Sequence, residues 1–364
     1  MSMGKLQKPN SVDLDETKIK MGQIWPDWYQ TLRIFRASNS LKATSQLINT
    51  IIPYFCLWYL TILSVQLGYP YILTLLLILT NAVFLVRMFI LFHDCVHYSL
   101  FKSKNTNKFF GSFLGVLLFI SFKDWRFTHL KHHGTYANLD SRGYGDIWTM
   151  TKKEYEVAST MQRLRYRLYR NPLVLFGLGM FLLSKRPSYF MVKPKERIDI
   201  IFTYLLIFAV AFAVSRITGW SLYFLIQLPM VWFAGGVGAW LFYVHHQFEG
   251  GYWARQSDWN PLSAAMEGSS FFKLPAVLNW FSSNIGYHHI HHIDPSIPNY
   301  HLRKCYNSVP ALQEKTPINN TKILNCFRLK LWDEDLHKMV AFPRKGKFTL
   351  KHRRSGEQNT TRKS

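Results

Sequence analysis

Four long apolar runs set the strongest limit on how this chain can fold. They cover residues 51–67, 71–92, 200–219 and 221–244, and the only charged residues within them are Arg87 and Arg216. A membrane-spanning helix needs about 20 predominantly apolar residues. Three runs reach that length, and the first does so when Asn49 and Thr50 join it. The sequence therefore predicts an all-α integral membrane protein with four transmembrane helices.

Short turns join these runs in pairs. Residues 68–70 separate the first two runs, and little more than Trp220 separates the last two, so we expect two helical hairpins. Two shorter apolar stretches, 109–122 and 173–183, are predicted to be interfacial or buried helices because they are too short to span a bilayer comfortably. The side chain of Arg87 is expected to reach toward the lipid headgroups.

Basic residues fill the segments outside the hairpins. The net charge is +23, from 44 lysines and arginines against 21 acidic residues. Cytoplasmic segments of membrane proteins carry an excess of Lys and Arg, so both termini are expected in the cytoplasm, with anionic lipid headgroups rather than nucleic acid as the partner. The predicted organisation is a cytosolic or interfacial segment (1–46), a membrane domain (47–339) and a basic, disordered tail (340–364).

Eleven of the fourteen histidines fall into four tight clusters. Imidazole is a common protein ligand for iron, zinc and copper. On a helix, the spacing of the first cluster is i, i+4, and that of two others is i, i+3, i+4, so each set would project from one face. Because one metal ion takes about three to six ligands, the number of histidines suggests two ions. The clusters are His93 and His97; His129, His132 and His133; His245 and His246; and His288, His289, His291 and His292.

The order of spans and clusters places all four clusters on one side of the membrane. His93 follows the first hairpin directly and His245 follows the second, with no further crossing before His288. An even number of spans separates the clusters, so they can meet at the cytoplasmic surface. Cys95 lies inside the first cluster but on the opposite side of a helix from His93 and His97, which favours packing over metal ligation.

The size of the histidine set limits the chemistry. Zinc hydrolases use three protein ligands and an open position, which would leave most of these histidines idle. A transporter is expected to carry ionisable groups at mid-membrane, and the four runs contain no acidic residue. A non-haem di-iron centre that activates dioxygen to attack a C–H bond of a lipid chain fits this set best.

The chain resembles the membrane fatty acid desaturases of the acyl-lipid type, and bacterial members in particular. The resemblance rests on three histidine boxes, H-D-C-V-H, H-L-K-H-H and H-H-I-H-H, which begin at His93, His129 and His288. It runs from about residue 25 to about residue 315 and includes further matching segments at 142–148, 242–249, 284–287 and 298–300.

This resemblance implies four transmembrane helices under a cytosolic helical cap that holds two irons. It implies nine ligands, which are His93, His97, His129, His132, His133, His246, His288, His291 and His292. Five further residues are expected to orient the ligand rings or to act as extra ligands: Asp94, Asn138, His245, Asn284 and His289. For the aspartate and the two asparagines, an exposed or helix-capping role is the alternative.

The implied activity is oxygen-dependent desaturation of the acyl chain of a membrane lipid. The chain has no H-P-G-G motif of a fused cytochrome b5, so a separate ferredoxin or cytochrome b5 is expected to supply electrons. Phe242 and the H-x-x-x-H form of box one favour a lipid-bound chain over acyl-CoA, and His288 at the start of box three disfavours front-end chemistry.

Two other readings stay open. A hydroxylase, ketolase or acetylenase could use the same scaffold, because box residues do not decide the outcome after the first hydrogen is removed. A metal-handling membrane protein would bind iron or zinc without consuming dioxygen.

Overall fold

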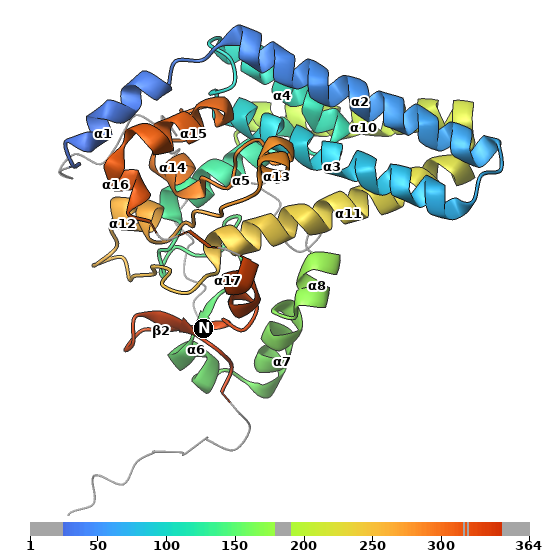
Figure 1. Ribbon diagram of the computed structural model, residues 1–364. Coiled ribbons are helices and arrows are strands. Elements are labelled where there is room, and N and C mark those ends of the chain that lie inside the picture. Colours follow the sequence, from blue (N-terminus) through green and yellow to red (C-terminus); the bar gives the residue numbers. More distant parts are fainter. Residues whose placement is uncertain (1–24, 179–190, 316, 319, 344–364) are drawn as a thin grey trace, which may run out of the picture.

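The computed structural model describes residues 25–178, 191–315, 317–318 and 320–343. Four helices in this part of the chain are long and apolar enough to cross a membrane: α2 (Ser40–Gln66), α3 (Tyr71–Val96), α10 (Pro194–Thr218) and α11 (Trp220–His246). The prediction of four membrane-length helices is therefore confirmed. In Figure 1 they run in a common direction, and α12, α14, α15 and α16 gather at one end of them.

Shorter elements surround that end. The helices are α1 (Trp28–Thr31), the 3-10 helix η1 (Leu32–Phe35), α4 (Lys104–Leu117), α5 (Phe122–Thr135), α6 (Lys152–Val157), α7 (Thr160–Tyr169), α8 (Pro172–Gly177), α12 (Pro261–Met266), α13 (Ala276–Phe281), α14 (His288–Ile293), α15 (Asn299–Ser308), α16 (Pro310–Gln313) and α17 (Asn320–Cys326). The strands are β1 (Met150–Thr151), β2 (Leu331–Asp333) and β3 (Lys338–Val340).

Each long helix extends past its apolar run at one end or at both. Asn39 caps α2 by accepting a hydrogen bond from the Lys42 amide at 3.0 Å, so the helix begins at Ser40, before the apolar run that starts at residue 51. Gly219, at φ +85°, ends α10 and lets α11 begin at once. The 27 residues of α11 correspond to about 40 Å at 1.5 Å per residue. The hydrocarbon core is about 30 Å thick, so the helix ends project beyond it.

The four helices differ in how much protein covers them. In the most apolar window of α3, 61% of residues are buried, against 11% in α10. The core cluster of α2, α3, α4 and α11 includes Leu91 and Phe92, just before the first histidine box. Thus α3 is the central helix of the bundle, and α10 presents most of its surface outward.

Arg87 corrects one expectation. Its side chain is 2% exposed and does not reach outward. It donates to Thr50 Oγ1 at 3.0 Å, to Ser283 Oγ at 3.2 Å and to the Trp280 carbonyl oxygen, with its guanidinium 3.9 Å from the centroid of the Trp280 ring. A buried guanidinium needs such acceptors around it, so Arg87 ties α3 to α2 and α13.

The apolar stretch 109–122 is not one helix. It is divided between α4 and the first residue of α5. At the break, the amides of Phe119 and Ile120 bond back to the carbonyl oxygens of Val116 and Gly115, and Phe119 takes φ +61°. This is a Schellman-type ending, formed here without glycine at the left-handed position. Of the stretch 173–183, only α8 and Leu178 lie within the described residues.

A small sheet departs from the all-α expectation. β1 pairs parallel with β2, which pairs antiparallel with β3 in the register Leu331↔Val340. The Asp333 carboxylate accepts hydrogen bonds from the amides of Asp335 and Leu336, which turns the chain between the two strands. Since β3 includes Val340, the folded part extends into the segment assigned to the tail, of which residues 344–364 lie outside the described residues.

A glycine just before box three gives a test of this packing. A Cβ at position 286 would overlap the Phe272 carbonyl oxygen, and the Gly286 carbonyl oxygen accepts from the Phe272 amide at 2.8 Å. Gly286→Ala should therefore destabilise the protein by about 1–3 kcal/mol through overpacking, measured as thermal unfolding in detergent. Gly238→Ala is the control, because no atom lies within 4 Å of its Cβ. Equal melting temperatures for the two variants would contradict this account of the packing.

Candidate metal centre

Four helix segments bring the histidine clusters together. His93 lies in the last turn of α3 and His97 caps that helix, while His246 is the last residue of α11. The second cluster occupies the last two turns of α5, and the fourth forms most of α14. The long helices thus deliver two clusters to the same end of the bundle, and α5 and α14 supply the rest.

Five histidines form a first set, whose ring nitrogens all lie within 4.8 Å of one another: His93, His97, His129, His133 and His291. The Nε2 atoms of four of these histidines form a series of close contacts. The distance is 2.9 Å from His97 to His129, 3.1 Å from His129 to His133, and 3.1 Å from His133 to His291.

A second set adjoins the first. The ring nitrogens of His132, His246 and His292 also lie within 4.8 Å of one another. His288 joins them, because its Nε2 is 3.0 Å from that of His246 and 3.1 Å from that of His292. The rings of His133 and His292 stack at 4.2 Å between centroids, which links the two sets. All nine residues that the resemblance implied as ligands therefore lie in these sets.

The nitrogen spacing is that of metal ligands. A ring nitrogen carries either one proton or one lone pair, so it makes one good hydrogen bond. His129 and His133 each have two ring-nitrogen neighbours, so hydrogen bonds cannot account for all three contacts. Two nitrogens bound at right angles to one ion, each at about 2.1 Å, would be about 3 Å apart. The first set therefore fits a shared metal ion.

Burial keeps these rings in the form that binds metal. Loss of solvent, followed by the charges of neighbouring histidines, lowers the pKa of His129, His133, His291 and His292 well below the usual value. The rings are consequently neutral at physiological pH, and only neutral imidazole offers a lone pair to a metal.

Asp146 is a site residue that the sequence reasoning missed. Its Oδ1 lies 2.6 Å from Nδ1 of His132, and its Oδ2 accepts a hydrogen bond from the Gly143 amide at 3.2 Å. The carboxylate therefore directs Nε2 of His132 toward the second set, and that atom has no other hydrogen-bond partner among the described residues. The only signal in the sequence was an acidic residue in the matching segment 142–148.

Asp94 lies beside the first set. One of its oxygens is 3.5 Å from Nδ1 of His93, and the other accepts hydrogen bonds from both the amide and the side chain of Asn299 at 2.8 Å. Asn299 is fully buried, so α15 holds this carboxylate in place. Cys95 packs in the apolar core and belongs to neither set.

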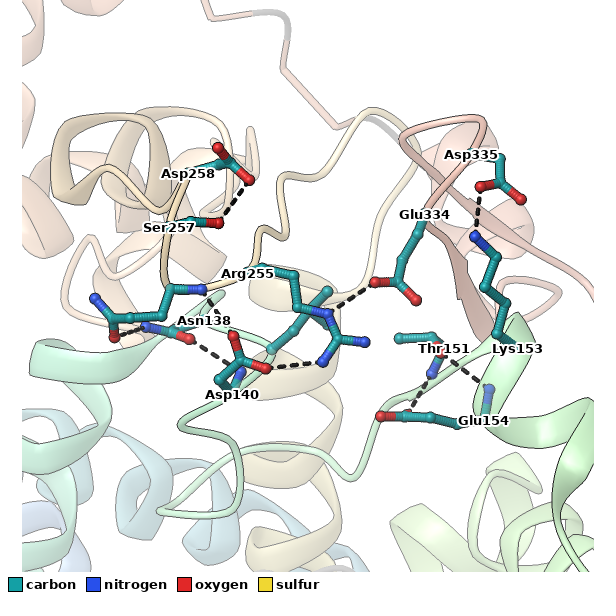
Figure 2. A network of polar contacts seen from close by, with 12 residues as sticks. Asn138, Asp140, Thr151, Lys153, Glu154, Arg255, Ser257, Asp258, Glu334 and Asp335 are labelled. Carbon is teal, nitrogen blue, oxygen red and sulfur yellow. Dashed lines mark hydrogen bonds and ion pairs between the residues drawn. The ribbon is translucent and has the colours of Figure 1, made fainter.

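The two asparagines have other partners than the ligand rings. Asn138 donates to Gln256 Oε1 at 2.8 Å and accepts from the Asp140 amide at 3.0 Å, so it holds its own loop, as Figure 2 shows. Asn284 takes φ +59° in a turn and donates to the Asn299 carbonyl oxygen at 3.3 Å. Their bonds therefore support the loops next to the second and third boxes.

The two remaining histidines flank the second set. The His245 ring stacks on that of His288, with centroids 4.2 Å apart and planes 16° apart. His289 points the other way, with its Nε2 3.2 Å from the Leu312 carbonyl oxygen. Neither belongs to a set of converging ring nitrogens; His245 packs against a ring of the second set, and His289 packs against Phe271 and Tyr306.

Comparison with known proteins agrees with this geometry. A family model described as fatty acid desaturase matches residues 69–319. The chain is 44% identical to a fatty acid desaturase of Bacillus subtilis over 85% of its own length and 88% of the relative's. It is 26% identical to an sn-1 acyl-lipid omega-3 desaturase (ferredoxin) of Synechocystis, over 67% and 70% of the two chains. The protein therefore belongs to the fatty acid desaturase family.

Proposed function

We propose that the protein is an oxygen-dependent di-iron desaturase that introduces a double bond into the acyl chain of a membrane lipid. The observation that carries the proposal is the pair of adjoining imidazole sets where α3 and α11 end. Family membership supports the class of reaction. The names of the relatives from Synechocystis, an omega-3 and an oleoyl-lipid 12-desaturase of the sn-1 position, support a lipid-bound substrate.

Each imidazole set would hold one iron. The first ion would bind to His93, His97, His129, His133 and His291, and the second to His132, His246, His288 and His292. Imidazole suits iron, and the pair of ions would supply dioxygen activation for attack on an unactivated C–H bond. The contribution of the chain is to fix the rings, which Asp146 and Asp94 do from outside the sets.

The reaction needs a lipid substrate and a separate reductant. Removal of two hydrogens from the chain, together with two electrons and two protons, reduces one dioxygen to two waters. A separate protein of the ferredoxin or cytochrome b5 type would supply the electrons, and the ferredoxin in the name of one relative supports this. The termini and the metal centre would lie on the cytoplasmic side, where the excess of Lys and Arg belongs and anionic headgroups are found.

Loss of a metal ligand provides the main test. His132→Ala should lower the iron content of the purified protein and abolish the new double bond in the lipids of an expression host, since no other ring occupies that position. The measurements are metal analysis and fatty-acid profiling at matched expression. Product formed at the wild-type level by this variant would refute the di-iron assignment. Hydroxylated lipid in the wild-type profile would instead favour the hydroxylase reading.

Asp146 should matter through the ring it holds. Asp146→Asn removes the negative charge that orients His132, and loss of such a partner typically costs about 10–100-fold in metal affinity or activity. Asp140→Asn is a matched control in the same loop, because its carboxylate pairs with Arg255 at 41% side-chain exposure and touches no histidine of the two sets. Iron titration of both purified variants checks the prediction, which fails if they bind iron equally.

The adjacent histidines at the end of α11 offer a second matched comparison. His246 directs Nε2 to the second set, whereas His245 stacks on a ring of that set. His246→Ala should therefore eliminate desaturation, and His245→Gln should retain a substantial fraction. The assay is the fatty-acid profile of host membranes at equal protein level. Equal losses, or a loss at His245 alone, would show that the wrong residue has been assigned as a ligand.

A further inference from the structure

The outward face of α7 is apolar where a helix at a water-exposed surface would be polar. Tyr166 and Arg170 on its inner side are fully buried. On the other side, Met161 is 56% exposed, Leu164 49% and Leu168 53%. A surface helix in water usually places charged residues opposite its buried face, so the apolar residues on this face need a partner.

Helical geometry makes these residues a continuous stripe. At 100° per residue, Met161, Leu164 and Leu168 fall within about 60° of one another. Arg165 and Arg167 lie on the two borders of this stripe, and both are exposed. The Nε of Arg167 donates to the Tyr155 hydroxyl at 2.5 Å, which leaves its terminal N–H groups to face the headgroups. An apolar stripe between basic borders is the pattern of a helix that lies in a membrane interface, with arginines reaching the headgroups.

The neighbouring helix α8 sets the depth of α7 in the membrane. The Trp232 indole donates to the Gly177 carbonyl oxygen at 2.6 Å, and a Cβ on Gly236 would lie 3.0 Å from the Phe176 carbonyl oxygen. Trp232 is 14 residues before the end of α11, or about 21 Å at 1.5 Å per residue. α11 is about 10 Å longer than the hydrocarbon core is thick. Even if all of this extra length lies outside the core at the His246 end, the contact between α8 and α11 lies within the bilayer.

The chain therefore enters the bilayer directly after α7. The apolar surface also continues on both sides of that helix, with Val157 86% exposed before it and Leu173 84% exposed after it. In the view of Figure 1, α7 runs at a steep angle to α11 rather than along it. Such a helix can lie in the plane of the membrane surface.

We propose that α7 is a membrane-surface helix, whose Met161, Leu164 and Leu168 stripe contacts lipid acyl chains and whose bordering arginines bind anionic headgroups. The metal centre is linked to it, because Arg170, just past the end of α7, donates to Gln247 Oε1 at 2.8 Å, one residue after His246. The membrane surface thus sets the height of the second imidazole set. The inference rests on the membrane insertion in the proposed function and not on its chemistry.

Depth measurements on the full chain test this proposal. Spin labels are attached at Leu164→Cys, at Leu168→Cys and, as a control, at Ser257→Cys in an exposed loop, each in a Cys56→Ser background because Cys56 is the exposed native cysteine. The protein is held in nanodiscs of phosphatidylcholine and phosphatidylglycerol. Labels at 164 and 168 should relax strongly with oxygen and weakly with a water-soluble nickel chelate, and the label at 257 should do the reverse. Strong relaxation by nickel at 164 and 168 would overturn the proposal.

Three further outcomes are decisive. Arg165→Glu should make the label at 164 more accessible to nickel in discs with phosphatidylglycerol but not in pure phosphatidylcholine. The same accessibility in both kinds of disc would refute the proposed contact with anionic headgroups. Protection from nickel only after an acidic protein such as ferredoxin is added would assign the face to that protein. Protection only in discs with two chains, with dipolar broadening between labels, would assign it to a second copy. Because no result depends on iron or activity, failure here is separable from failure of the proposed function.

Discussion

The convergence of nine imidazole rings is the constraint around which this protein is built. The Nε2 atoms of seven of these rings approach one another to 2.9–3.1 Å, and hydrogen bonds alone cannot account for such contacts because each ring nitrogen makes only one. Burial of unpaired polar groups costs free energy. The arrangement therefore fits rings whose inner nitrogens share metal ions.

Buried polar side chains hold two of the four ring-bearing segments, α3 and the end of α11, in position. Arg87 joins α3 to α2 and to α13, and Asp94 joins the end of α3 to α15. Arg170 connects the residue after His246 with the Leu329 carbonyl oxygen near the small sheet. Truncating one partner of a buried polar pair leaves the other unsatisfied, so these residues are expected to be as sensitive to mutation as the apolar core.

The arrangement also explains why the small sheet and its loops surround the bundle end. Figure 2 shows Arg255 between Asp140 and Glu334, which connects the loop after box two with the turn between β2 and β3. That loop carries Asp146, and residues more than a hundred positions away contact it. The second imidazole set is therefore supported from three separate parts of the chain.

Local pattern was enough for the features with short-range causes. Length and apolarity predicted the four long helices, since a helix in a bilayer must satisfy the hydrogen bonds of its own backbone. The i, i+4 and i, i+3, i+4 spacings placed the histidines of each box on one face of a helix. Long-range contacts decided the rest. The choice of Asp146 over Asn138 as a partner of a ligand and the burial of Arg87 both depend on side chains distant in sequence. No periodicity records such contacts, because they exist only once the helix ends have met.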